Sequence, residues 1–475
     1  MKKTICMLLI FVLSMSLFAC SGQPEQTEPS QTEAPAESWL QAGFARVDIT
    51  PDYSAGLAGS GNSGTRRSEE VLDPISITCV ALGDGEQTIL VFTVDTLGIN
   101  MSLASDLRSA VRKATKTHPG RIFFGATHTH SAPDPLYDDE PGRNYRQLLC
   151  DAAADAAAKA IADLAPAVME AGTKEIPGMN FVRHYKMSDG SYAGPNFGTF
   201  EGLEITGYSG TVDPELSLVK LAREGDKADI LMLNWQAHPN RSSELGYYKI
   251  SADFVGALRD KLEADTGMQV AYFTGASGNV HIDSQIEADS HGMNWKEYGQ
   301  KLADCAKDAL SVLKPVEGTG ISTATLTYNA PIDHSWDGQL SQANEVYALW
   351  QKDGKPAGDA LGLTYGFTSV YQARSIIERS KLPETIPWEM FAFRVGGVGF
   401  TTGVYEMFAE AGKYVKDNSP FETTFVITGN LIYVPTAEAY DYRCYEADTG
   451  YFARGTSEAL AEEYVGLLKK LTVDN

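Results

Sequence analysis

Apolar, β-branched runs alternate with helix-patterned segments along most of the chain, and this alternation constrains the fold more than any other feature. Short runs of this kind predict buried strands, and apolar residues at helical spacing predict amphipathic helices. The mixture indicates an α/β or mixed α+β domain, with a large β-sheet core flanked by helices. Hydrophobic patterning alone does not give the order of the strands.

The segment from residue 39 to residue 475 contains no internal repeat and no second low-complexity linker, so one large domain is expected there. The predicted strands are residues 75–82, 88–94, 121–126, 217–222, 230–235, 270–273, 323–328, 391–395, 398–401 and 424–428. The predicted helices are residues 102–117, 145–164, 251–266, 295–313, 342–351, 406–415 and 457–471.

The N-terminal region has a different character. Residues 1–19 carry two lysines, an apolar stretch and small residues, which is typical of a secretory signal peptide. The junction resembles a bacterial lipobox, which implies lipid attachment at Cys20; the alternative is a secreted protein with an incidental cysteine. Residues 20–38 are polar and predict a disordered tether. The chain is therefore expected to be a bacterial lipoprotein that is anchored to a membrane and lies outside the cytoplasm. The sequence does not say whether the membrane is the inner or the outer one.

The formal net charge of −23 argues against nucleic acid or an anionic lipid surface as a partner. Neutral or amphiphilic small substrates remain open. The later cysteines are widely spaced and show neither zinc-knuckle spacing nor a dense disulfide framework: Cys79, Cys150, Cys305 and Cys444. Their disulfide status and the oligomeric state do not follow from the sequence.

Two histidines, His128 and His130, follow the predicted strand 121–126. Side chains two apart in an extended chain share a face, so both rings can converge on one volume. His238 and Glu406 also follow predicted strands, and loops at strand ends commonly carry functional residues. Two histidines and a glutamate would suit a catalytic zinc. The alternatives are ordinary polar residues at strand ends and, for Glu406, a carboxylate that opens a helix.

Five separated segments resemble the neutral (alkaline, non-lysosomal) ceramidase family, in the family's order. They are residues 42–51, 127–133, 237–239 with 251–254, 275–280, and 433–436 leading to Tyr445-Glu446. Because they span nearly all of the predicted domain, the resemblance implies a ceramidase-like catalytic domain, without the C-terminal immunoglobulin-like domain of larger members.

The resemblance also implies one zinc ion per chain and a set of site residues. The implied ligands are His128, His238, Glu406 and Tyr433. Tyr445, twelve positions after the tyrosine ligand, and Arg183, in the segment Asn180-Phe181-Val182-Arg183, match catalytic positions of the family. His130 could carry a proton to the leaving group. Asp95 could orient a ligand histidine or serve a turn.

The chain departs from the family in two loops. Gly278-Asn279-Val280-His281 stands where ceramidases have Gly-Asp/Asn-x-Ser, and Ala132-Pro133-Asp134-Pro135 replaces Gly-Pro-Gly-Gly. Asn279 and His281 are therefore candidate pocket residues. His281 could act as an acid or base, bind the metal with Asp283, or be an ordinary polar loop residue.

These observations predict a zinc-dependent hydrolase that cleaves an amide bond in ceramide or a related N-acyl lipid through a zinc-activated water. One alternative is a zinc-dependent esterase or deacylase with a non-lipid substrate. Another is a lipid-anchored solute-binding protein, which would explain the anchor and tether but not the implied metal ligands. The true substrate and its acyl preference do not follow from the sequence.

Overall fold

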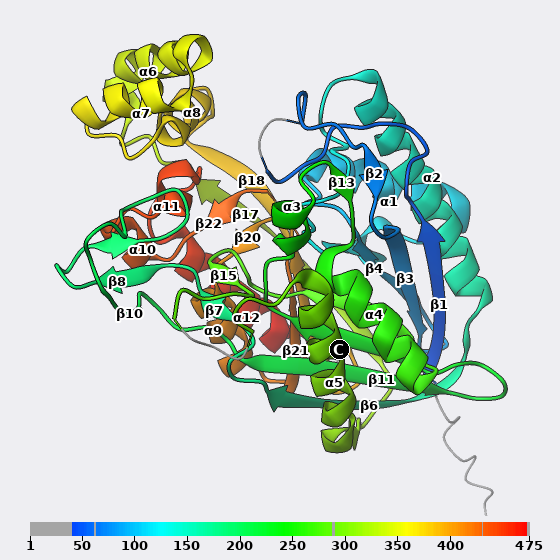
Figure 1. The fold of residues 1–475 in the computed structure, drawn as a ribbon. Coiled ribbons are helices and arrows are strands. Elements are labelled where there is room, and N and C mark those ends of the chain that lie inside the picture. Colours follow the sequence, from blue (N-terminus) through cyan, green and yellow to red (C-terminus); the bar gives the residue numbers. More distant parts are fainter. Residues whose placement is uncertain (1–39, 61–62, 287–289, 430, 473–475) are drawn as a thin grey trace, which may run out of the picture. The chain divides into compact units, whose positions relative to one another are not determined.

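Two large β-sheets lie face to face, with helices on their outer faces, in the computed structural model (Figure 1). The structure describes residues 40–60, 63–286, 290–429 and 431–472. The predicted signal peptide, Cys20 and the whole predicted tether lie outside the described residues. Among the described residues, no helix has the length and apolar character needed to span a membrane.

The larger sheet has nine strands in the order β14-β12-β11-β6-β1-β3-β4-β5, with β16 also paired to β6. It is mixed, because β4–β5 and β12–β14 are parallel pairs and the other pairs are antiparallel. Its strands are β1 (Leu40–Asp48), β3 (Ser76–Gly83), β4 (Thr88–Val94), β5 (Ile122–Ala126), β6 (Ala165–Glu175), β11 (Glu215–Arg223), β12 (Ile230–Trp235), β14 (Gln269–Thr274) and β16 (Lys314–Pro315).

The second sheet has four strands: β17 (Ile321–Pro331), β18 (Thr385–Val395), β19 (Val398–Gly403) and β21 (Thr423–Ile427). Alternate residues of the facing strands fill the layer between the two sheets, as strand geometry requires. Phe123 of β5 stacks on Phe393 of β18 with ring centroids 4.3 Å apart. This apolar layer fixes the ends of β5 relative to the second sheet.

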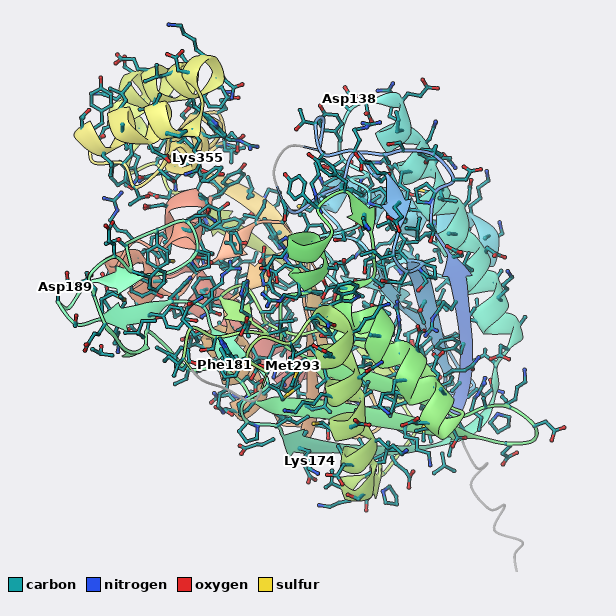
Figure 2. All side chains as sticks on the ribbon, viewed as in Figure 1. Asp138, Lys174, Phe181, Asp189, Met293 and Lys355 are labelled. Atoms are coloured by element: carbon teal, nitrogen blue, oxygen red, sulfur yellow. The ribbon has the colours of Figure 1, made fainter. Side chains whose placement is uncertain are left out.

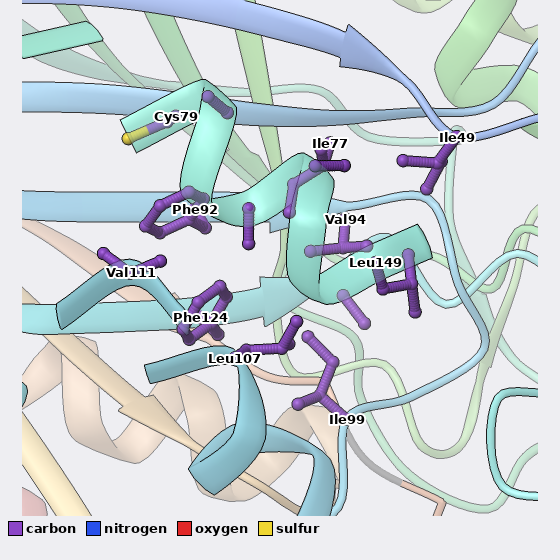
Figure 3. Close-up of a cluster of buried hydrophobic side chains, with 14 of the residues drawn as sticks. Ile49, Ile77, Cys79, Phe92, Val94, Ile99, Leu107, Val111, Phe124 and Leu149 are labelled. Carbon is purple, nitrogen blue, oxygen red and sulfur yellow. The ribbon is translucent and has the colours of Figure 1, made fainter. Parts of the chain in front are cut away.

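Helices cover both outer faces of the paired sheets. α1 (Met101–Thr115) and α2 (Glu140–Ala162) pack on β1, β3, β4 and β5, where Leu107, Phe92 and Phe124 share one buried cluster (Figure 3). α4 (Asp253–Thr266) and α5 (Trp295–Ala309) cover β11, β12 and β14. α9 (Ala409–Asp417) and α12 (Thr456–Lys470) cover the outer face of the four-stranded sheet. The result is a four-layer helix–sheet–sheet–helix arrangement.

Three helices, α6 (Leu340–Asp353), α7 (Lys355–Thr364) and α8 (Val370–Arg379), form an insertion between β17 and β18 (Figures 1 and 2). The insertion has its own apolar core. The remaining short elements are β2 (Glu70–Val71), β7 (Phe181–Val182), β8 (Tyr185–Met187), β9 (Tyr192–Ala193), β10 (Ile205–Tyr208), α3 (Arg241–Leu245), β13 (Lys249–Ile250), β15 (Val280–His281), β20 (Glu406–Met407), β22 (Tyr433–Val434), α10 (Ala437–Asp441) and α11 (Tyr445–Thr449).

Every predicted strand is present, within three residues at its ends except that β18 starts six residues before its predicted start, and the mixed α+β prediction is confirmed. β1 and β6 were not predicted, because both mix apolar residues with glycine and polar residues. The predicted helix at 406–415 begins too early. Glu406 lies in β20, where its backbone N–H donates to Ile432 O at 3.0 Å, and α9 starts at Ala409. The cysteines in the described part of the chain are free thiols.

Candidate metal centre and active site

His128 lies just beyond β5, on a backbone that is held and strained. The N–H of Thr127 donates to Val94 O at 2.8 Å, and the N–H of His128 donates to Thr96 O at 3.0 Å. The φ of His128 is 68°, in the left-handed region that non-glycine residues seldom occupy. Such strain persists only where surrounding contacts enforce it. Here it directs the imidazole away from the strand axis and into the interior.

The other two candidate ligands come from different strands. His238 follows β12, and its N–H donates to Val280 O at 3.2 Å; Glu406 is in β20. The two edge strands of the large sheet, β5 and β14, meet near this point, where the Thr274 hydroxyl donates to Thr127 O at 2.8 Å. Segments that follow β5 and β12 are thereby brought together although several strands separate them in the sheet.

Three buried acceptor atoms converge at the centre of this site. His128 Nε2 and His238 Nε2 are 3.1 Å apart, and Glu406 Oε1 lies 3.3 Å from the first and 3.2 Å from the second. The Nδ1 atoms face backbone carbonyls, Leu97 O at 2.6 Å and Ser277 O at 2.8 Å. Because a carbonyl oxygen only accepts, each Nδ1 carries the proton and each Nε2 presents a lone pair.

This arrangement fits a divalent cation. Two imidazole lone pairs and a carboxylate oxygen repel one another unless a cation lies between them, and histidine and carboxylate are common zinc ligands. The side chains are shielded from water, with exposures of 4% for His128, 0% for His238 and 4% for Glu406. Burial lowers the pKa of His238 well below its usual value, which favours the neutral, ligating form. The carbonyl partners of Nδ1 orient both rings.

His130 is the third imidazole at the site. One of its ring nitrogens lies within 4.8 Å of a ring nitrogen of His128 and of His238, and its buried Nε2 has no hydrogen-bond partner among the described residues. Burial, with the neighbouring imidazoles, lowers its pKa well below the usual value. Its backbone is fixed by Arg66, which donates to His130 O at 2.8 Å, and its ring packs against Gly59. His130 therefore has a free nitrogen beside the ligand set.

Tyr433 and Tyr445 lie next to Glu406. Tyr433 pairs in register with Glu406 in the short parallel ladder of β20 and β22, and its ring centroid is 6.2 Å from that of Tyr445. Burial raises the pKa of Tyr433 well above its usual value and that of Tyr445 to about 12. Arg183 donates from Nη2 to the Tyr433 hydroxyl at 3.2 Å. The structure thus gathers the predicted tyrosines and arginine beside the imidazoles.

Glu446 is a buried member of this site that sequence reasoning did not assign. Arg183 donates to its Oε1 through Nε, at 2.7 Å, and through Nη2, while His184 Nε2 lies 2.9 Å from its Oε2. Tyr192 of β9 stacks on Tyr442, whose hydroxyl is 3.0 Å from His184 Nδ1. The adjacency of Glu446 to Tyr445 was the one available signal.

Three other candidates have different outcomes. The ring of His281 is 6.0 Å from that of His238, and its Nε2 lies 2.8 Å from the Asn240 amide nitrogen, so it borders the site. The side chain of Asn279 instead donates to Glu410 at 3.0 Å and accepts from the Ala409 N–H at 2.9 Å, which fixes the start of α9. Asp95 accepts from the Ser76 N–H at 2.8 Å and pairs with Arg259 at 2.7 Å, so of the two roles considered for it the orientation of a histidine is not seen.

Comparison with known proteins agrees with this architecture. No protein-family description and no curated protein matches the sequence. Among solved structures, neutral ceramidase from Pseudomonas aeruginosa superposes with a TM-score of 0.67 at 16% identity, covering 92% of this chain and 76% of that one. A structure described as ceramidase complexed with C2 gives a TM-score of 0.67 at 15% identity, covering 92% and 77%. The chain therefore has the neutral ceramidase fold, as expected from the sequence.

Proposed function

We propose that the chain is a zinc-dependent hydrolase that cleaves an amide bond of an N-acyl lipid such as ceramide. The observation that carries this proposal is the convergence of His128 Nε2, His238 Nε2 and Glu406 Oε1 within 3.1 to 3.3 Å, with no donor among them. The shared fold with two solved ceramidases, one of them complexed with C2, supports the choice of reaction.

The residues around His128, His238 and Glu406 would take different parts in the reaction. Tyr433 completes the proposed ligand set, and one zinc ion bound there supplies the Lewis acidity that activates water and polarises a carbonyl. The free Nε2 of His130 accepts a proton from the attacking water and returns it to the leaving amine. Tyr445 and Arg183 donate hydrogen bonds to the oxygen on which negative charge develops.

The experiment is hydrolysis by the purified full chain of a panel of ceramides, N-acyl amino acids and simple esters, with and without a chelator. We expect amide cleavage that chelation abolishes and added zinc restores. His128→Ala should lose both zinc and turnover. His118→Ala is the matched control, since this exposed histidine only caps a turn. If only esters were cleaved, the proposed amide hydrolase would have to be reclassified as an esterase. If His128→Ala kept full activity, the proposed metal site would have no part in the reaction.

We also propose that the protein works outside the cytoplasm, anchored to a membrane through lipid on Cys20. The lipobox-like junction after an apolar leader supports this proposal. Expression in a bacterial host followed by membrane fractionation tests it. Cys20→Ala should shift the protein from the membrane to the soluble extracytoplasmic fraction, whereas an unchanged distribution would contradict the anchor.

A further inference from the structure

Glu446 occupies the centre of a buried polar network next to the proposed zinc ligands. It is 1% exposed, Arg183 donates to its Oε1, and His184 Nε2 lies 2.9 Å from its Oε2. His184 is fixed in turn by Tyr442 at 3.0 Å on its Nδ1. A hydrogen bond donated by the Tyr442 O–H to Nδ1 leaves the imidazole proton on Nε2, the ring nitrogen nearest the carboxylate.

A second metal is the first alternative to consider, since His184, Cys444 and Glu446 each offer a ligand atom and these atoms lie within 4.8 Å of one another. Two features argue against it. The guanidinium of Arg183 already places a positive charge on the carboxylate at Oε1, and His184 Nε2 lies 2.9 Å from Oε2.

The network instead constrains Arg183. Arginine has several N–H donors on a long, flexible side chain, so it acts at a defined point only if its guanidinium is held. Glu446 contacts Nε and Nη2 together, and Nη2 also donates to the Tyr433 hydroxyl at 3.2 Å. Burial by itself would raise the pKa of Glu446, but the Arg183 charge outweighs this effect and holds it below the usual range. The carboxylate therefore remains charged.

We propose that Glu446 is a positioning residue that holds Arg183 against Tyr433, with His184 next to the second carboxylate oxygen. The consequence for catalysis rests on the proposed hydrolase function. The pairing of Glu446 with Arg183 does not, because it is a property of the folded chain. The two parts can therefore be tested separately in the same variants.

The first test is a double-mutant cycle on thermal unfolding of the full chain, with Glu446→Gln, Arg183→Gln and the double variant. A buried charge left without its partner destabilises a protein more than loss of the pair. We expect the double variant to lose less stability than the sum of the single variants. Additive losses would overturn the pairing, whether or not a substrate has been found.

The second test measures hydrolysis per mole of bound zinc. We expect Glu446→Gln to keep its zinc and its KM but to lose about 100-fold in kcat, the size of effect seen when catalytic groups are misplaced. Asp441→Asn, an exposed carboxylate five residues upstream, is the matched control. Formate should partly restore Glu446→Ala, and formamide should not. Unchanged kcat per zinc in Glu446→Gln would reduce Glu446 to a structural residue, and a wild type without zinc would instead refute the hydrolase proposal.

Discussion

Gly59 gives a sharp test of the role assigned to His130. This glycine has φ +93°, and a Cβ there would lie 2.7 Å from Cγ and 2.8 Å from Nδ1 of His130. The same Cβ would lie 2.9 Å from Cα of His130. Ordinary carbon contacts are about 3.5–4.0 Å, so residue 130, ring and backbone together, must shift by about 1 Å in Gly59→Ala. A misplacement of that size can cost about 100-fold in rate. The three atoms nearest to this Cβ all belong to His130, and none belongs to a proposed zinc ligand.

The matched control is Gly85→Ala. Gly85 has a similar φ of +89°, but a Cβ there meets nothing within 4 Å. Both substitutions carry the same kind of backbone cost, about 1–2 kcal/mol for a side chain in this conformation. We expect a larger loss of thermal stability in Gly59→Ala, because the contact with His130 adds to the shared backbone cost, and unchanged zinc content in both, with the fall in kcat confined to Gly59→Ala. Equal activity of the two variants would refute the placement of His130 in the reaction.

Three further predictions follow from the same geometry. Tyr433→Phe should weaken zinc binding, whereas Tyr445→Phe should keep its zinc and lose about 10²–10³-fold in kcat, as measured by zinc titration and kinetics. Phe123→Ala should lower the free energy of unfolding by about 3–5 kcal/mol in denaturant titration, because the ring is 1% exposed and stacked on Phe393, while kcat per folded molecule stays unchanged. The pKa of Glu446 in the folded protein lies below its unfolded value of about 4.3, so the charged carboxylate stabilises the fold above about pH 4.3. This contribution is lost as the pH falls through the folded pKa. The difference in unfolding free energy between the wild type and Glu446→Gln should therefore shrink below about pH 4.3.

Much of the fold follows from local patterning. Strands such as β4 and β12 are mostly apolar, and their bounds match the prediction because strands buried on both faces read as near-continuous apolar runs. β6 was missed because alanine, glycine and charged residues interrupt its pattern. The face-to-face packing of two sheets was also not predictable, since an apolar strand face can be covered by a helix or by a strand.

The candidate site was likewise predicted in part from the sequence. His128, His238 and Glu406 were found because each follows a strand, and the resemblance to ceramidases joined them into one set. Their convergence depends on contacts across the fold, such as the Thr274 hydroxyl on Thr127 O, which no local pattern encodes. Glu446 was missed for a related reason, because its importance lies in its partner 263 positions away in the sequence.

The zinc content of purified full-length variants tests the central claim most directly. We predict about one tightly bound zinc per chain in the wild type and in Glu410→Gln, a matched glutamate four residues beyond Glu406 whose partner is Asn279. Glu406→Gln and His238→Ala should bind zinc at least 10-fold more weakly while remaining folded. A folded wild type that takes up no zinc, or Glu406 and His238 variants that bind it as the wild type does, would contradict the account.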